Sequence, residues 1–107
     1  MLETTSQYIY VLKLIPKLLD ETKWTHKEND IVGRHFKALQ QLQSEGQLIL
    51  AGRTQNMDET TFGIVIFKAK NENEAILIME NDPAVKDGIM TAQLYPYQVA
   101  LISESNL

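Results

Sequence analysis

GRHFKALQQLQSEGQLILAGR, residues 33–53, holds most of a predicted helix, the residue that ends it and the strand that follows. The helix is predicted to begin after Thr25, because Thr25 and Glu28 have the T-x-x-E spacing of a capping box. Gly46 is the expected terminator, since glycine adopts the left-handed conformation that commonly closes a helix. QLILA, residues 47–51, has the short apolar composition of a strand. The stretch therefore predicts a helix followed directly by a strand.

Two further strands are predicted on either side of this unit. QYIYVLKLI, residues 7–15, is rich in aromatic and β-branched residues, and Pro16 ends it. The segment PKLLDETKW then connects this strand to the helix. After a polar loop, GRTQNMDET, the stretch TFGIVIFKA (residues 61–69) is predicted to be a third strand.

The last part of the chain predicts a second helix and a closing strand. Asn71, with Glu74 three residues later, suits the N-cap of a helix over NENEAILIMEN. Asp82 and Pro83 suit the cap and first turn of a short further helix, PAVKDG. The closing stretch IMTAQLYPYQVALI is one strand, or two strands separated at Pro96.

The predicted order is β-α-β-β-α-β, the split β-α-β arrangement of ferredoxin-like α+β folds. A chain of 107 residues is long enough for one compact core and too short for two ordinary domains. We therefore expect a single domain over residues 1–107.

Both faces of the predicted sheet are apolar. Tyr8, Tyr10 and Leu12 point to one face of the first strand, whereas Ile9 and Val11 point to the other. Two helices cover only one face of a four-stranded sheet, so the second face needs a partner. A second copy packed sheet against sheet is the simplest solution, and a homodimer is expected.

The composition restricts the function. With 44% hydrophobic and 22% charged residues the chain is typical of a soluble globular protein, and its formal charge of -4 opposes nucleic-acid binding. The absence of cysteine excludes disulfides, thiolate metal sites and a cysteine nucleophile. The sequence shows no signal peptide or membrane span, so a cytoplasmic location without membrane contact is expected.

His35 interrupts the apolar stripe of the long helix, between Ile31 and Leu39, and therefore faces the sheet. Periodicity leaves two readings: a neutral imidazole satisfied inside the core, or a proton-transfer group at the base of a cleft. Of these, the core histidine is the commoner case. His26 lies on the opposite side of the helix, so the two histidines do not have metal-ligand spacing, and no metal site is expected.

The run from His35 to Gly52, H-x3-L-x2-L-x2-E-G-x-L-x3-G, together with Asp82-Pro83 ahead of the last strand, resembles the YCII-related (YciI-like) family. The resemblance implies a ferredoxin-like subunit of a dimeric α+β barrel, with a cleft that holds a catalytic histidine-aspartate pair. Carried over, the pair is His35 and Asp82. A carboxylate beside an imidazole fixes its tautomer and stabilises the imidazolium, which suits acid/base chemistry. Asp82 is also an ordinary helix N-cap, and both roles are compatible.

The chain departs from the family pattern at Val32, where many members carry an arginine. Arg34 points elsewhere on the helix, whereas Arg53, at the end of the second strand, is placed to reach the cleft. Arginine suits carboxylate recognition because its guanidinium is a rigid fork of donors. The alternative for Arg53 is an exposed loop residue.

Three more residues complete the expected substrate-binding set. Gly52 either lets the backbone approach a ligand or serves the turn. Pro83 follows the aspartate, and Tyr95 is a candidate wall residue, as is Trp24; such aromatics are more often core or edge residues.

Two functions are compatible with these residues. The first is a cofactor-independent enzyme that carries out isomerisation, elimination or lactone chemistry on a small organic molecule, with His35 as acid or base and Asp82 orienting it. The second is a ligand-binding or accessory module that uses the same cleft without turnover. A third reading is a scaffold with a structural histidine. No phosphate-binding, dinucleotide-binding, serine hydrolase or zinc protease motif is present, so no cofactor is expected, and the sequence does not name a substrate.

Overall fold

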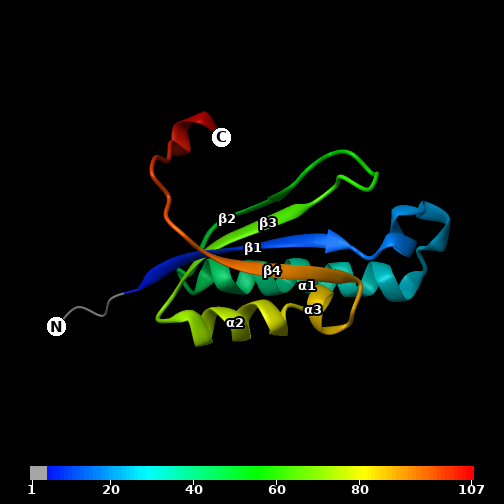
Figure 1. Cartoon of the computed structure of the whole chain (residues 1–107), viewed down its shortest axis with the longest axis horizontal. Coiled ribbons are helices and arrows are strands. Elements are labelled where there is room, and N and C mark those ends of the chain that lie inside the picture. The colour runs from blue at the N-terminus through cyan, green and yellow to red at the C-terminus, as the bar shows by residue number, and fades with distance from the viewer. Residues whose placement is uncertain (1–4) are drawn as a thin grey trace.

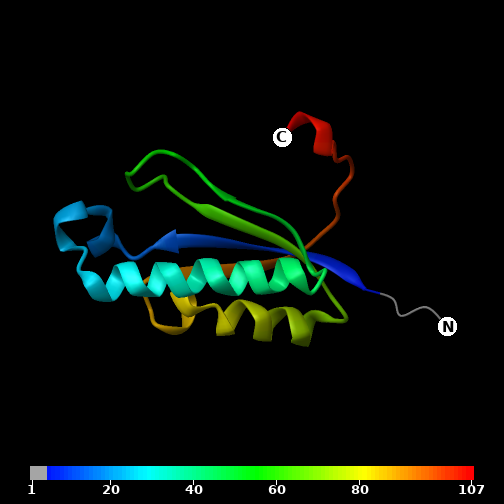
Figure 2. The same ribbon diagram turned by 180° about the vertical axis from the view of Figure 1, so that it is seen from behind.

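The computed structural model of the chain describes residues 5–107, and a four-stranded antiparallel sheet with strand order β2-β3-β1-β4 lies at its centre. The elements are β1 (Ser6–Leu14), α1 (His26–Ser44), β2 (Leu48–Arg53), β3 (Gly63–Ala69), α2 (Glu72–Asn81), α3 (Pro83–Lys86) and β4 (Met90–Tyr97). Short 3-10 helices occupy Pro16–Leu19, Glu21–Lys23 and Glu104–Asn106. All three α-helices lie on one face of the sheet (Figures 1 and 2). The predicted β-α-β-β-α-β order and ferredoxin-like α+β class are confirmed.

Helix α1 has defined ends at both of the predicted positions. The Thr25 side chain accepts a hydrogen bond from the backbone of Lys27, and the Glu28 carboxylate accepts one from the Thr25 amide, completing a capping box. At the other end Gly46 has φ of 77°, and the amides of Gly46 and Gln47 donate back to carbonyls of the last turn. This is the glycine-terminated arrangement that satisfies otherwise unpaired carbonyls. The two ends fix which residues of α1 face the sheet.

The core lies between the sheet and the helices. Tyr10 of β1 is paired with Val65 of β3 and Leu94 of β4, so these three side chains share the helix-covered face. Tyr10 and Phe67 are almost completely buried, and their rings meet edge to face with centroids 5.6 Å apart. Burial of large aromatic side chains is the main stabilising contribution at this layer.

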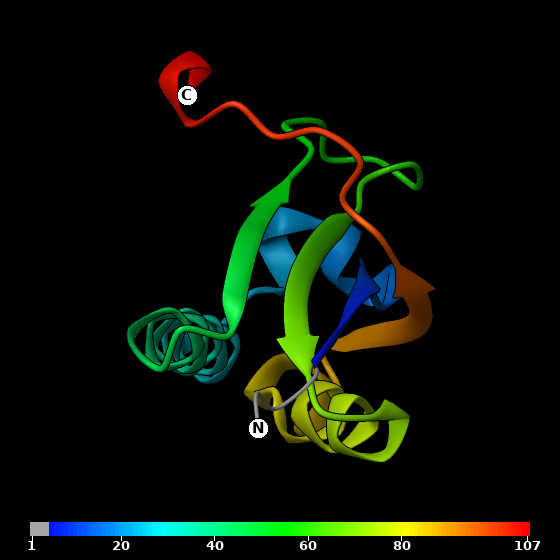
Figure 3. The same ribbon diagram turned by 90° about the vertical axis from the view of Figure 1, so that its left-hand side faces the viewer.

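The three α-helices all lie away from the opposite face of the sheet, and the C-terminal segment extends on that side (Figure 3). Ile9 and Val11 of β1 lie on this face beside Ile66 and Ile64 of β3. Tyr95 pairs with Ile9 from β4 and is 48% exposed. The expectation of an apolar second face is confirmed, whereas its pairing with a second copy stays a prediction.

The closing stretch follows the first of the two predicted alternatives but is shorter than the predicted stretch. It forms one strand, which ends at Tyr97, and residues 98–102 lie outside the sheet. Pro96 is accommodated within β4 because β4 is an edge strand, where a missing N–H leaves no ladder partner unsatisfied. Beyond the strand, the backbone amide of Val99 donates to Oε1 of Gln7 at 2.6 Å, and the chain then leaves the sheet (Figure 1).

Within residues 5–107, no helix has the length and apolar character needed to cross a bilayer. The cytoplasmic location stays a prediction.

We predict that Thr25→Ala lowers the free energy of unfolding by about 1 kcal/mol, because the first turn of α1 loses its cap. Thr25→Ser keeps the accepting hydroxyl and is the matched control, with nearly unchanged stability. Chemical denaturation followed by circular dichroism measures both variants. Equal stability of Thr25→Ala and the wild type would show that the capping box contributes nothing to the fold.

Candidate functional site

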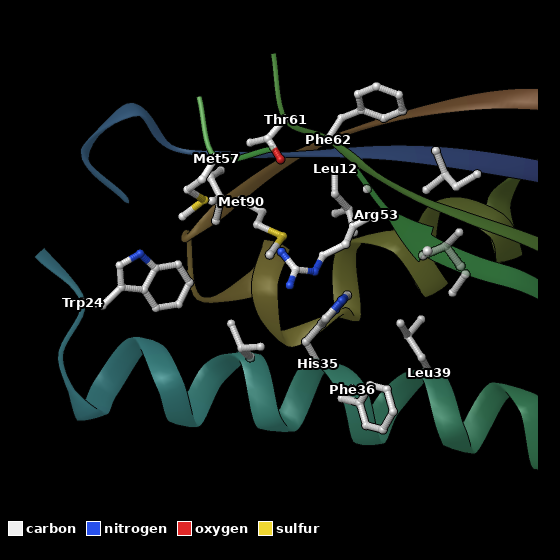
Figure 4. A pocket seen from close by; sticks show the side chains of 17 residues that line it. Leu12, Trp24, His35, Phe36, Leu39, Arg53, Met57, Thr61, Phe62 and Met90 are labelled. Carbon is white, nitrogen blue, oxygen red and sulfur yellow. The ribbon is translucent and has the colours of Figure 1, made fainter. Parts of the chain in front are cut away.

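A pocket of about 450 Å³ lies between α1 and the end of the sheet formed by β2 and β3 (Figure 4). Most of its lining side chains are aliphatic, aromatic or thioether groups: Leu12, Leu14, Trp24, Val32, Phe36, Leu39, Met57, Phe62, Ile64, Val65 and Met90. The ionisable side chains among its lining residues are His35 and Arg53. An apolar cavity with a few converging polar groups is the usual form of a small-molecule site.

His35 projects from α1 into this pocket (Figure 4). Its Nδ1 lies 2.6 Å from Oδ1 of Asp82. Because an ionised carboxylate only accepts hydrogen bonds, this contact places the ring proton of His35 on Nδ1. Within residues 5–107, Nε2 of His35 makes no hydrogen bond. Every buried side-chain nitrogen or oxygen in this range has a hydrogen-bond partner, so Nε2, which has none, is not buried and is accessible.

The Asp82 side chain is only 1% exposed and accepts hydrogen bonds from three elements. Its Oδ1 accepts from His35 of α1 and from the backbone amide of Ala84 in α3 at 3.0 Å, and its Oδ2 accepts from the Tyr10 hydroxyl of β1 at 2.7 Å. Asp82 occupies the junction of α2 and α3, where it caps α3 ahead of Pro83. The predicted cap and the predicted partner of His35 are therefore the same carboxylate.

Tyr10 is a site residue that the sequence analysis assigned only to the sheet. Burial raises the pKa of its hydroxyl well above the usual range, and the charge of Asp82 and the hydrogen bond to it act in the same direction. The hydroxyl therefore stays protonated and donates to the carboxylate. Its partner lies 72 residues away along the chain, so no local pattern indicated the pair.

Arg53 extends from the end of β2 into the middle of the pocket, toward Met90 and His35 (Figure 4). Its side chain makes no hydrogen bond or ion pair within the part of the chain that the structure describes. Arg34, in contrast, lies on the outer side of α1, where it is paired with Asp30 at 3.0 Å and with Asp87 at 2.7 Å. Arg53 is thus the arginine available to a ligand.

The other predicted wall and binding residues divide into two groups. Gly52 and Trp24 line the pocket, and the Trp24 indole is held by a 2.8 Å hydrogen bond to the Leu18 carbonyl. Pro83 begins α3 behind Asp82 and is not among the residues that line the pocket. Tyr95 lies on the helix-free face of the sheet, opposite Ile9, and is not brought to the pocket either.

The hairpin between β2 and β3 supplies part of the pocket that the sequence analysis treated only as a polar loop and strand. Met57, Thr61 and Phe62 of this hairpin lie over the pocket (Figure 4). The Thr61 hydroxyl is within 3.0 Å of the Thr54 hydroxyl, which ties the two arms of the hairpin together. Met57 and Phe62 remain partly exposed, so the hairpin forms an apolar rim above His35 and Arg53.

In residues 5–107 no group of three or more histidine, cysteine, aspartate or glutamate side chains is arranged to hold a metal ion. The ionisable groups that converge at the pocket are instead one imidazole and one guanidinium, which suit an anion or a proton-exchanging oxygen.

Comparison with known proteins identifies the family. The model of the YCII-related domain matches residues 7–96. The chain belongs to the YCII-related family, as its sequence motifs indicated. A search of the curated proteins returned no match.

Among solved structures, the fold is similar to that of 5-chloro-2-hydroxyhydroquinone dehydrochlorinase (TftG) from Burkholderia phenoliruptrix AC1100, in complex with 2,5-dihydroxybenzoquinone. The TM-score is 0.65 at 19% sequence identity, and the match covers 86% of this chain and 93% of the other. At this identity the likeness establishes a shared fold.

We predict that Asp82→Ala lowers the free energy of unfolding by roughly 3 kcal/mol, because the buried Tyr10 hydroxyl and Ala84 amide lose their acceptor. Asp30→Ala is the matched control: it removes an exposed carboxylate that pairs with Arg34, and exposed pairs contribute little. Denaturant unfolding compares the two variants. A similar decrease in the free energy of unfolding in both variants would show that the buried hydrogen bonds of Asp82 stabilise the fold no more than an exposed ion pair does.

Proposed function

We propose that the chain is a cofactor-independent acid/base protein that acts on a small organic anion in this pocket. The observation that carries the proposal is the orientation of His35. Its Nδ1 is held by the buried Asp82, while Nε2 remains accessible within an apolar pocket that also contains Arg53. An imidazole fixed in one tautomer beside a carboxylate is an effective general base and, once protonated, a general acid.

The proposed chemistry is proton transfer. His35 Nε2 removes a proton from a carbon or oxygen of the substrate, and Asp82 stabilises the imidazolium that forms. The electron pair left on the substrate either moves to a neighbouring atom or expels a leaving group. Return of the proton to a different position completes an isomerisation, whereas its loss to the departing group or to water completes an elimination. No covalent bond to the protein is required.

The pocket favours a compact substrate with an apolar body and one anionic group. Trp24, Phe36 and Phe62 provide aromatic surfaces, while Arg53 is the cation available to a carboxylate, phenolate or enolate oxygen. The ligand in the TftG structure, 2,5-dihydroxybenzoquinone, is a hydroxylated ring. This agreement supports aromatic acids and hydroxylated rings as the first class to test.

A ligand-binding module without turnover uses the same pocket and is the second candidate. The exposed rim formed by Met57 and Phe62 favours neither candidate, because binding and catalysis both need access. Product formation from a bound ligand separates the two. A structural histidine, the third reading, predicts no ligand at all.

We also propose a homodimer formed by the helix-free face of the sheet. Ile9, Val11 and Ile64 are partly exposed apolar residues on this face, around the buried Ile66, and the aromatic ring of Tyr95 adds to the surface. Monomeric proteins rarely leave a contiguous apolar face of this kind in water. Packing against the same face of a second copy buries it symmetrically.

We predict that Arg53→Met weakens binding of a small aromatic acid by about 10–100-fold, because a charge-assisted hydrogen bond is lost while most of the apolar length is kept. Thermal-shift titration with benzoate, salicylate and hydroxyquinones measures the affinities. Arg34→Met, which changes an arginine outside the pocket, is the control and leaves binding unchanged.

His35→Asn is expected to retain binding and to abolish turnover of any compound that the wild type converts. If His35→Asn still binds the compound and still converts it, the proposed role of the imidazole is contradicted. Binding by the wild type with no product from any ligand would favour the ligand-binding module.

We predict that Val11→Glu yields a folded monomer, because a charge at the centre of the helix-free face opposes its burial. Gln40→Glu, on the exposed side of α1, is the charge-matched control and stays dimeric. Sedimentation velocity at micromolar concentration gives the mass of each. A wild-type protein that sediments as a monomer would rule out the dimer.

A further inference from the structure

We propose that Tyr10 is a positioning residue for the His35–Asp82 pair: its buried hydroxyl fixes the orientation of the Asp82 carboxylate and so keeps His35 in one tautomer. A role for Tyr10 in catalysis rests on the proposed function. The effect of Tyr10 on the His35 tautomer rests only on the contacts described below.

The two oxygens of Asp82 are held differently. Oδ1 accepts from both His35 Nδ1 and the Ala84 amide, whereas Oδ2 accepts from Tyr10 alone. The Asp82 side chain is 1% exposed, so water does not replace a missing donor at Oδ2. Tyr10 is therefore the contact that prevents the carboxylate from turning about its Cβ–Cγ bond to satisfy Oδ2 elsewhere.

Tyr10 itself is rigid. Its ring is 1% exposed and packs edge to face on Phe67, and its backbone lies in the middle of β1, paired with Val65 on one side and Leu94 on the other. A hydroxyl carried by such a ring has little freedom to move. Burial and the charge of Asp82 raise the pKa of the hydroxyl, which favours its protonated, donating form.

The consequence for His35 concerns its tautomer. In a neutral imidazole, a nitrogen that donates to a fixed carboxylate carries the ring proton, and the other nitrogen is then an acceptor. While the carboxylate is fixed, the proton stays on Nδ1 and Nε2 faces the pocket as an acceptor. When the carboxylate turns, the Nδ1 hydrogen bond becomes intermittent, and the tautomer protonated at Nε2 becomes populated. In that tautomer Nε2 carries a proton and does not act as a base toward a ligand.

The matched variants are Tyr10→Phe and Tyr8→Phe. Tyr8 lies on the same face of β1, is 7% exposed and also contacts Phe67, with ring centroids 6.1 Å apart. Its hydroxyl makes no hydrogen bond in the part of the chain that the structure describes. Each variant removes one hydroxyl and retains the aromatic ring. Only Tyr10→Phe also removes a hydrogen bond to Asp82.

The experiment is nitrogen-15 NMR of histidine-labelled protein without ligand. We expect the His35 ring of the wild type and of Tyr8→Phe to show one tautomer, protonated at Nδ1. In Tyr10→Phe the ratio of the two tautomers should move by about tenfold toward the Nε2-protonated form, with faster exchange of the Nδ1 proton. His26, at the exposed start of α1, is an internal reference and should be unchanged in all three proteins.

An unchanged His35 signature in folded Tyr10→Phe would overturn the inference, as would equal changes in both variants. If Tyr10→Phe does not fold, the wild type still provides a test through its tyrosine hydroxyl protons. The Tyr10 hydroxyl should exchange slowly enough with water to give its own resonance, unlike that of Tyr95, which is 48% exposed. Equally fast exchange of both would also overturn the inference. Because no ligand is used, the result stands whether or not the pocket proves to be catalytic.

Discussion

The carboxylate of Asp82 is the point on which the rest of this structure depends. It joins β1 through Tyr10, α1 through His35 and α3 through Ala84, three elements that are distant in sequence. An unpaired carboxylate in this position would be costly, since a buried charge is stabilised only when its hydrogen bonds are made. The network therefore specifies how the helices sit on the sheet as well as how His35 is oriented. Stability and site geometry share the same contacts.

This arrangement explains how a small α+β domain holds an imidazole in a defined orientation at the wall of an apolar pocket. The helix ends at Thr25 and Gly46 fix which residues of α1 face the sheet, His35 among them. The sheet on which α1 packs limits how far the imidazole extends from the helix. The polar atoms of the pair face inward, whereas the accessible edge of the ring faces the pocket. Preorganisation of this kind reduces the reorganisation needed when charge develops on a ligand.

The side chains that line the pocket come from several elements of the fold. Its walls come from α1, from the β2–β3 hairpin, from β1 and from β4, and the fold is similar to that of a structure at 19% sequence identity. Val32 lines the pocket from α1, and Arg53 brings a guanidinium into the same pocket from the sheet side. Fold similarity thus describes the frame, while recognition depends on side chains that the frame allows to vary.

The order of the elements, both ends of α1, the apolar character of both sheet faces and the direction of His35 could be predicted from the sequence, because they follow from local spacing and capping. The motif also indicated Asp82 as the partner of His35. Tertiary structure decided the rest: Tyr10 meets Asp82 across 72 residues, and the register of β4 places Tyr95 opposite Ile9, on the face away from the pocket. Periodicity assigns a residue to one of two faces. Which side chains meet there depends on strand register and helix packing, which are set by contacts between distant parts of the chain.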